Sequence, residues 1–315
     1  MPAILAVLLA AMCFGTTGTA QALGPSADPV ALGAARIAVG GIALALVATV
    51  VSHAGPRALS NGLRSRGGWG VTGLRSRAAW GRGWVAVGAF GVLAYQPAFF
   101  LGTARNGVAV GTVIALGSAP VLTGLATWAL GRGRPGRSWF VATALATTGV
   151  TVLGLAPGDP GAATAGGLDV VGVLASLGAG AAYALYTLAG AALIGGGWTS
   201  TTSMGAMFGV AGVLSVGVLA VVGTGGLTSP AGLATVLWLG LVTTTAAYVL
   251  FGYGLARLGS ATVATLTLAE PLTATLLGLL VLGERLPGRA VLGLVVLACG
   301  LVVLAVDVRT RRAAA

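Results

Sequence analysis

The chain has 315 residues, of which 57% are apolar and only 7% are charged, and its mean hydropathy is +0.99. Soluble globular domains carry about 25% charged residues, so this composition excludes a water-soluble fold and predicts an all-α polytopic membrane protein. The 17 basic residues are all Arg and give a net charge of +11. They form short clusters between apolar stretches and not one solvated basic face, so we expect the lipid bilayer, and no nucleic acid, as a partner.

Ten apolar segments are long enough to cross a bilayer, whose core requires about 20 residues per helix. In chain order they cover residues 3–23, 29–51, 83–103, 108–130, 138–156, 169–194, 201–223, 231–253, 261–282 and 289–306. We expect a first five-helix unit over 1–156, a linker at 157–168, a second unit over 169–306 and a tail at 307–315. The Arg-rich loop at 52–82 is interpreted as a tether, with binding of anionic lipid or a partner as the alternative.

The arginines also predict the orientation of the chain. With the N-terminus inside, thirteen of them fall in inside loops and three in outside loops. The positive-inside rule then places both termini in the cytoplasm. We expect a multi-pass protein of a bacterial inner membrane, with four tryptophans at the cytoplasmic ends of the spans: Trp84, Trp128, Trp139 and Trp198.

The two halves of the chain repeat one another at an offset of 151 or 152 residues. Pro120 matches Pro271, and Pro135-Gly136-Arg137 matches Pro287-Gly288-Arg289. Because each half holds five spans, the second half enters the membrane with the opposite polarity. In secondary transporters, such an inverted repeat places the substrate site near the midplane between the halves.

A run near the C-terminus resembles the drug/metabolite transporter superfamily, in particular its EamA-like exporters. The run is Leu268-Ala269-Glu270-Pro271-Leu272-Thr273-Ala274-Thr275-Leu276-Leu277-Gly278, followed by Leu282-Gly283-Glu284-Arg285-Leu286. The resemblance covers the chain apart from residues 52–82 and implies a ten-helix, five-plus-five exporter of small metabolites or drugs, driven by the proton gradient. The first half departs from the second because Ala119 stands where the second half has Glu270, and Arg132 where it has Glu284.

Four residues are candidates for a central coupling site. Glu270 is a carboxyl group inside a span, where burial is costly, so we expect it to face a cavity and to exchange a proton, or to serve as structural polar contact. Arg36 lies in the second span and is predicted to pair with Glu270 or to extend toward the membrane surface. Pro120 and Pro271 interrupt two related helices, which favours a site lined by exposed backbone carbonyls, although a packing kink is the alternative.

Polar and aromatic residues near these positions are candidates to line a substrate cavity. Such a lining suits a neutral, zwitterionic or amphiphilic small molecule. The candidates are Thr16, Thr17, Gln21, Tyr95, Gln96, Tyr183, Tyr186, Thr187 and Tyr248.

The sequence therefore predicts a secondary-active exporter of small metabolites, amino acids or drug-like solutes that works by alternating access with protons as the coupling ion. The alternative is a non-transporting membrane scaffold or receptor. An enzyme is not expected, because the single histidine and the two distant cysteines, Cys13 and Cys299, offer no catalytic or metal constellation. We expect no cofactor and no metal, while monomer and homodimer stay open.

Overall fold

The computed structural model describes residues 2–54, 71–154, 168–283 and 288–313. Within these ranges the chain forms helices joined by turns, without strands, which confirms the predicted all-helical membrane fold. Most of the Arg-rich loop, most of the 157–168 linker and Glu284 lie outside the described residues.

In the described residues of the first half, the chain forms five helices. They are α1 (Pro2–Leu23), α2 (Pro29–Ala54), α4 (Val71–Asn106), α5 (Val108–Ala129) and α6 (Arg137–Gly154). Helix α4 begins at Val71 and not near residue 83, because residues 71–82 contain no proline that would end a helix.

The described residues of the second half also form five crossings, of which one contains a π-helical segment and another is interrupted at residues 267–268. The elements are α7 (Val170–Gly195), α8 (Ser200–Val222), α9 (Pro230–Leu237), η1 (Trp238–Ala246), α10 (Ala247–Leu255), α11 (Ser260–Leu266), α12 (Ala269–Val281) and α13 (Gly288–Ala313). Elements α9, η1 and α10 form one crossing, and α11 and α12 form the next. Among the described residues, nine crossings are long and apolar enough to span a membrane, and the shorter α6 is the tenth.

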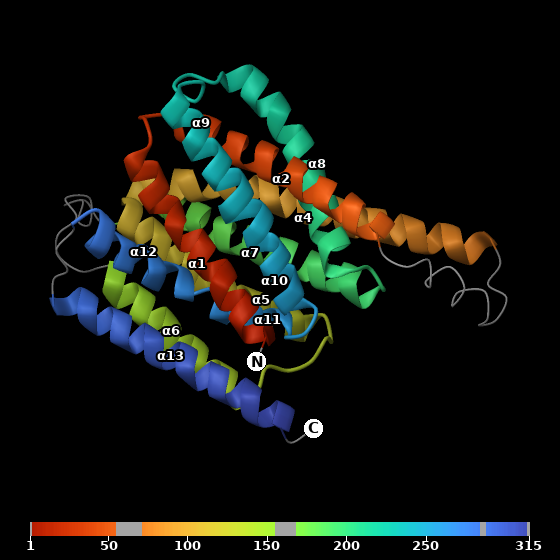
Figure 1. Ribbon diagram of the computed structural model, residues 1–315. Helices are drawn as coiled ribbons and strands as arrows, with labels where there is room; N and C mark the ends of the chain where they lie inside the picture. Colours follow the sequence, from red (N-terminus) through yellow and green to blue (C-terminus); the bar gives the residue numbers. More distant parts are fainter. Residues whose placement is uncertain (1, 55–70, 155–167, 284–287, 314–315) are drawn as a thin grey trace.

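Packing between the halves follows a pseudo-two-fold arrangement. Helix α2 packs against its counterpart α8, and α6 packs against its counterpart α13. The contact of α4 with α7 has its equivalent in the contact of η1 and α10 with α1, and α5 on α7 has its equivalent in α12 on α1. This pairing is the packing expected of two five-helix repeats (Figure 1).

Glycines allow the two self-paired interfaces to bring backbones into contact. A Cβ atom added at Gly149 of α6 would lie 2.7 Å from the Gly293 carbonyl oxygen of α13. One added at Gly212 of α8 would lie 3.0 Å from the Ile37 carbonyl oxygen of α2. Small residues at these helix–helix contacts therefore let the two backbones touch directly, without side chains between them.

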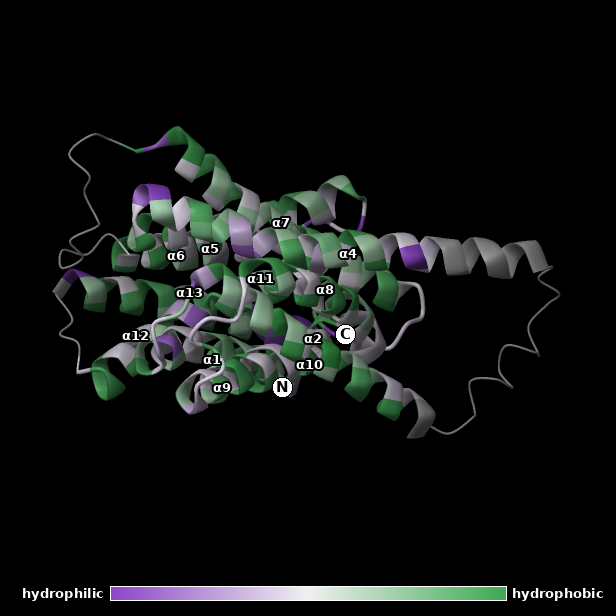
Figure 2. Cartoon of the chain, turned by 90° about the horizontal axis from the view of Figure 1, so that it is seen from above, coloured by the Kyte–Doolittle hydropathy of each residue, from purple (hydrophilic) through white to green (hydrophobic). Residues whose placement is uncertain are grey.

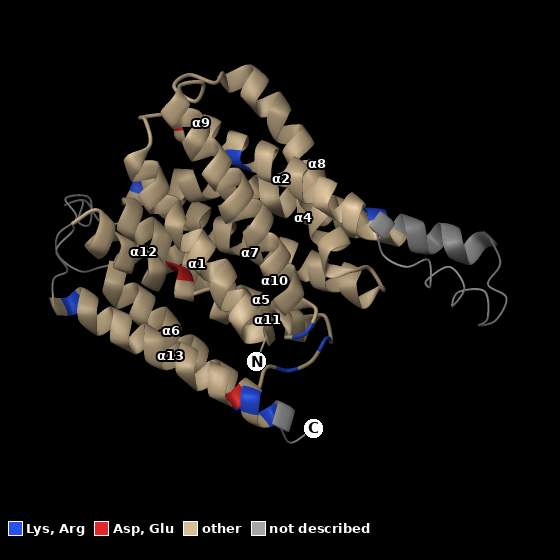
Figure 3. Ribbon diagram, viewed as in Figure 1, with Lys and Arg blue, Asp and Glu red and all other residues tan. Residues whose placement is uncertain are grey.

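The N- and C-termini lie near one another at one end of the bundle, which we call the terminal end (Figure 1). Hydrophobic residues cover the helices along their length, and charged residues lie mostly toward the ends of the bundle (Figures 2 and 3). Large apolar side chains lie on the surface: Leu280 and Val221, for example, are 77% and 88% exposed. Such an apolar surface is stable only in lipid.

Candidate functional site

Glu270 lies in the first turn of α12, just after the break that separates α12 from α11. The Glu270 amide N–H donates to the Thr267 carbonyl oxygen at 2.9 Å, a tighter spacing than in an α-helix. Helix α1 lies directly against this turn, since a Cβ atom added at Gly15 would be 2.8 Å from the Glu270 carbonyl oxygen. A carboxylate in this position is stabilised by the positive end of the α12 dipole.

Arg36 does not form the predicted ion pair with Glu270. Its Nε donates to the Thr244 hydroxyl at 3.2 Å and its Nη2 to the Thr243 carbonyl oxygen at 3.4 Å. Both acceptors belong to the π-helix η1, which packs against α2. The guanidinium remains within electrostatic range of the Glu270 carboxyl group.

The two repeat-related prolines have different effects. Pro271 follows the break between α11 and α12, whereas Pro120 is buried inside the continuous helix α5, and Pro97 likewise lies within α4. Four residues before each proline, where the ring disturbs the backbone carbonyl, the second repeat has Thr267 and the first has Leu116. The Thr267 hydroxyl donates to the Ala264 carbonyl oxygen at 2.8 Å and thereby supports the break.

Tyrosines of α7 and α10 lie beside this break. The Tyr183 and Thr267 hydroxyls are 2.7 Å apart, and the Tyr186 and Tyr248 hydroxyls are 3.0 Å apart. All three tyrosines are buried. Their rings pack with Phe14, Phe208 and Phe251 into an aromatic cluster.

Several of the predicted residues interact electrostatically with Glu270 without a direct hydrogen bond to its carboxyl group. Tyr95, Tyr183 and Tyr248 all lie within electrostatic range of its carboxyl group, and Arg36 lies within range of Tyr95 and Tyr248. The structure thus brings residues of α2, α4, α7, α10 and α12 together between the two repeats.

Other candidates lie apart from this group or have a different role. Gln96 lines a lateral cavity of about 350 Å³ between α2, α4 and α8, and Gln21 is exposed near the end of α1. The Thr16 hydroxyl accepts a hydrogen bond from Trp238 Nε1 at 3.0 Å. Thr17 and Thr187 have buried hydroxyl oxygens without a hydrogen-bond partner in the described part of the chain.

The two half-helices of the divided crossing differ in accessibility. Helix α11 is sealed against α5 and α6 by three polar contacts: Thr127 to Ser260 at 2.8 Å, Trp139 Nε1 to the Ala261 carbonyl oxygen at 3.1 Å, and Thr143 to Thr265 at 2.9 Å. Residues 271–275 of α12 are all partly exposed, and α5 packs on α11. Polar contacts thus hold α11 against the first repeat, while the first turns of α12 keep partly exposed side chains.

Sequence reasoning did not identify the π-helix or its role in holding Arg36. The signal available was the run Thr243-Thr244-Thr245, whose hydroxyls bond to backbone carbonyls four or five residues earlier. It also did not single out Phe208 and Phe251, because isolated phenylalanines in apolar segments carry no distinguishing pattern.

The fold and the central group define a polytopic helical membrane protein built from two inverted five-helix repeats. The model of the EamA-like transporter family matches residues 1–155 and 170–306. The "Uncharacterized transporter YwfM" of Bacillus subtilis (strain 168) is 38% identical over 310 residues, which cover 98% of this chain and 95% of the relative. A solved structure described as "Crystal structure of protein" has the same fold, with a TM-score of 0.73, 19% identity and 98% coverage of both chains.

The chain belongs to the EamA-like transporter family, within the drug/metabolite transporter superfamily. It is a multi-pass membrane transporter protein.

Proposed function

We propose that the protein is a secondary-active exporter of small metabolites, amino acids or drug-like solutes, working by alternating access and coupled to protons through Glu270. The observation that carries this proposal is the position of Glu270, a carboxyl group at the start of a half-helix between two inverted repeats. Divided helices at repeat interfaces form the substrate and ion sites of other secondary transporters.

The central group supplies the contacts that a small solute requires. Glu270 offers an anionic carboxylate or a protonated donor, and Arg36 offers guanidinium N–H groups beyond those bonded to η1. The tyrosine and phenylalanine rings offer apolar faces. An acidic and a basic side chain that are not ion-paired to one another suit a solute with a neutral or zwitterionic head and an apolar body.

Alternating access requires the seal around α11 to open when the α12 side closes. The Thr127–Ser260 and Thr143–Thr265 contacts join the first repeat to the second, so they are the contacts that must break. With both termini in the cytoplasm of a bacterial cell, the α11 contacts would close the cytoplasmic side, which must open to exchange solute with the cytoplasm.

Transport is tested with the purified full chain in proteoliposomes. A panel of radiolabelled amino acids and cationic or neutral drug-like solutes is supplied with and without an imposed pH gradient. We expect gradient-dependent flux of at least one solute. The Glu270→Gln variant should lose the response to the pH gradient, because an amide cannot bind and release a proton.

Asp28→Asn is the matched control. Asp28 accepts a hydrogen bond from the Ala31 amide at the start of α2, and Asn caps a helix about as well as Asp, so flux should be unchanged. Absence of flux for every solute would contradict transport and favour a scaffold or receptor. Flux by Glu270→Gln with an intact pH response would contradict proton coupling through this residue.

A further inference from the structure

We propose that the terminal end of the bundle holds a binding site for an anionic phospholipid, with its phosphate group bound by Arg132, Arg134 and Arg311. The site is a cavity of about 220 Å³ between the loop joining α5 to α6, the beginning of α11 and the end of α13. It lies on the opposite side of the α11 seal from Glu270 and is independent of the transported solute.

The lining of this cavity carries an excess of positive charge. Three arginines face it, against the single acidic residue Asp307. The Asp307 carboxylate already accepts hydrogen bonds from Ser138 at 2.8 Å and from Arg311 Nε at 2.9 and 3.0 Å. The remaining guanidinium N–H groups of the three arginines are suited to phosphate oxygens, which accept paired hydrogen bonds from arginine.

Aromatic rings fix the orientation of two of these arginines. The Arg132 guanidinium lies 5.4 Å from the centroid of Trp84, and that of Arg134 lies 5.4 Å from the centroid of Trp128. Arg132 also donates one N–H to the Leu188 carbonyl oxygen at 3.2 Å. A stacked guanidinium keeps the N–H groups along its edge for a ligand, so both side chains are held ready for an anion.

The loop that carries these arginines depends on glycine. Gly131 and Gly133 have φ angles of +66° and +117°, a backbone conformation that other residues rarely adopt. The alternation of glycine and arginine makes a tight loop that presents Arg132 and Arg134 at the cavity.

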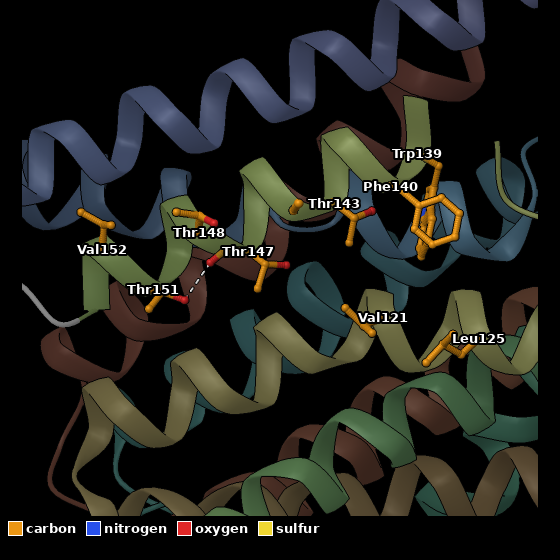
Figure 4. Close-up of a pocket in the computed structure, with 10 residues that line it drawn as sticks. Val121, Leu125, Trp139, Phe140, Thr143, Thr147, Thr148, Thr151 and Val152 are labelled. Atoms are coloured by element: carbon orange, nitrogen blue, oxygen red, sulfur yellow. Dashed lines mark hydrogen bonds between the residues drawn. The ribbon is translucent and has the colours of Figure 1, made fainter. Parts of the chain in front are cut away.

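An apolar groove begins beside the basic cavity and shares one wall with it. The groove, of about 420 Å³, lies between α5 and α6 (Figure 4), and Trp139 lines both spaces. The hydroxyls of Thr143 and Thr151 are bonded to Thr265 and to the Thr147 carbonyl oxygen, so these residues leave mainly their methyl groups for the groove. Val121, Leu125 and Phe140 on its rim are 39%, 46% and 50% exposed.

A basic cavity next to a lipid-facing apolar groove matches a phospholipid and not a free anion. The headgroup phosphate would bind the arginines, and an acyl chain would lie along α6 past Phe140 and Thr147. Trp128, which is 47% exposed near the same level, is typical of the membrane–water interface. Basic pockets between helices at this depth recognise anionic headgroups.

The experiment uses the purified full chain in detergent, titrated with phosphatidylglycerol or with phosphatidylcholine of the same acyl chains. Bound lipid is counted by native mass spectrometry. We expect phosphatidylglycerol to bind more tightly, and Arg134→Ala to weaken its binding about fivefold, the effect of removing one basic residue near a membrane surface. Leu125→Trp, which fills the groove and keeps every charge, should weaken both lipids.

Arg289→Ala is the matched control, because Arg289 is an exposed arginine near the other end of α13. This variant should prefer phosphatidylglycerol as strongly as the unaltered chain does. Equal binding of the two lipids, or equal losses in Arg134→Ala and Arg289→Ala, would overturn the proposal. Unchanged lipid binding in Leu125→Trp would overturn the acyl-chain part. Displacement of the lipid by inorganic phosphate at matched concentration would show a site for free anions and would also overturn it.

Discussion

The close contact of α6 with α13 leads to a prediction about Gly149. In Gly149→Ala, the new Cβ atom would lie 2.7 Å from both the Gly293 carbonyl oxygen and the Leu297 Cα, whereas ordinary contact begins at about 3.4 Å. The Leu297 amide nitrogen would lie closer still. Backbone atoms cannot rotate away, so the two helices must separate by at least about 0.7 Å. Overpacking of this kind lowers the free energy of unfolding by about 1–3 kcal/mol.

The effect is measured as the midpoint of thermal unfolding of the full chain in detergent. With a shift of about 2 °C per kcal/mol for a chain of this size, Gly149→Ala should unfold about 2–6 °C below the unaltered protein. Gly217→Ala is the control, because a Cβ atom at this position of α8 meets nothing within 4 Å. Alanine favours a helix over glycine, so the control should unfold at the same temperature or higher. Equal midpoints for the two variants would refute the backbone contact.

Two further predictions concern hydrogen bonds between elements, and both are measured by thermal unfolding. Asn106→Ala removes two part-buried hydrogen bonds to the Asp169 backbone, at 3.0 and 2.8 Å. It should cost about 1–3 kcal/mol, because each bond contributes about 0.5–1.5 kcal/mol. A midpoint unchanged from the unaltered protein would contradict this tie between α4 and α7. Tyr183→Phe removes the 2.7 Å hydrogen bond with the Thr267 hydroxyl and should lower the free energy of unfolding by about 1 kcal/mol. The control Tyr253→Phe, at a partly exposed position, should lower it less. The reverse order would contradict the role of Tyr183 at the helix break.

The membrane fold and its repeat were accessible from the sequence because they depend on composition and spacing. A run of about 20 apolar residues has few alternatives to a membrane-spanning helix. The internal match of Pro120 with Pro271 fixed the relation between the halves, and the packing of α2 on α8 and α6 on α13 agrees with it.

The local geometry of the central group was not accessible in the same way. The prediction that Arg36 pairs with Glu270 used depth in the membrane alone, and it missed the acceptors that a π-helix places beside α2. Whether a proline divides a helix also depends on neighbours: Thr267 bonds at the break, while Leu116 cannot. Such differences arise from single side chains and leave little trace in hydropathy.

The self-paired contacts α2–α8 and α6–α13 have a consequence for assembly. Each joins equivalent helices of two oppositely inserted units, as an antiparallel homodimer of five-helix chains would do. Because one polypeptide carries both units, these contacts form at a high effective concentration and do not depend on how much protein the membrane contains. The single chain also guarantees one copy of each orientation, so no mixture of oppositely inserted molecules is needed, and each unit is free to acquire residues, such as Glu270, that the other lacks.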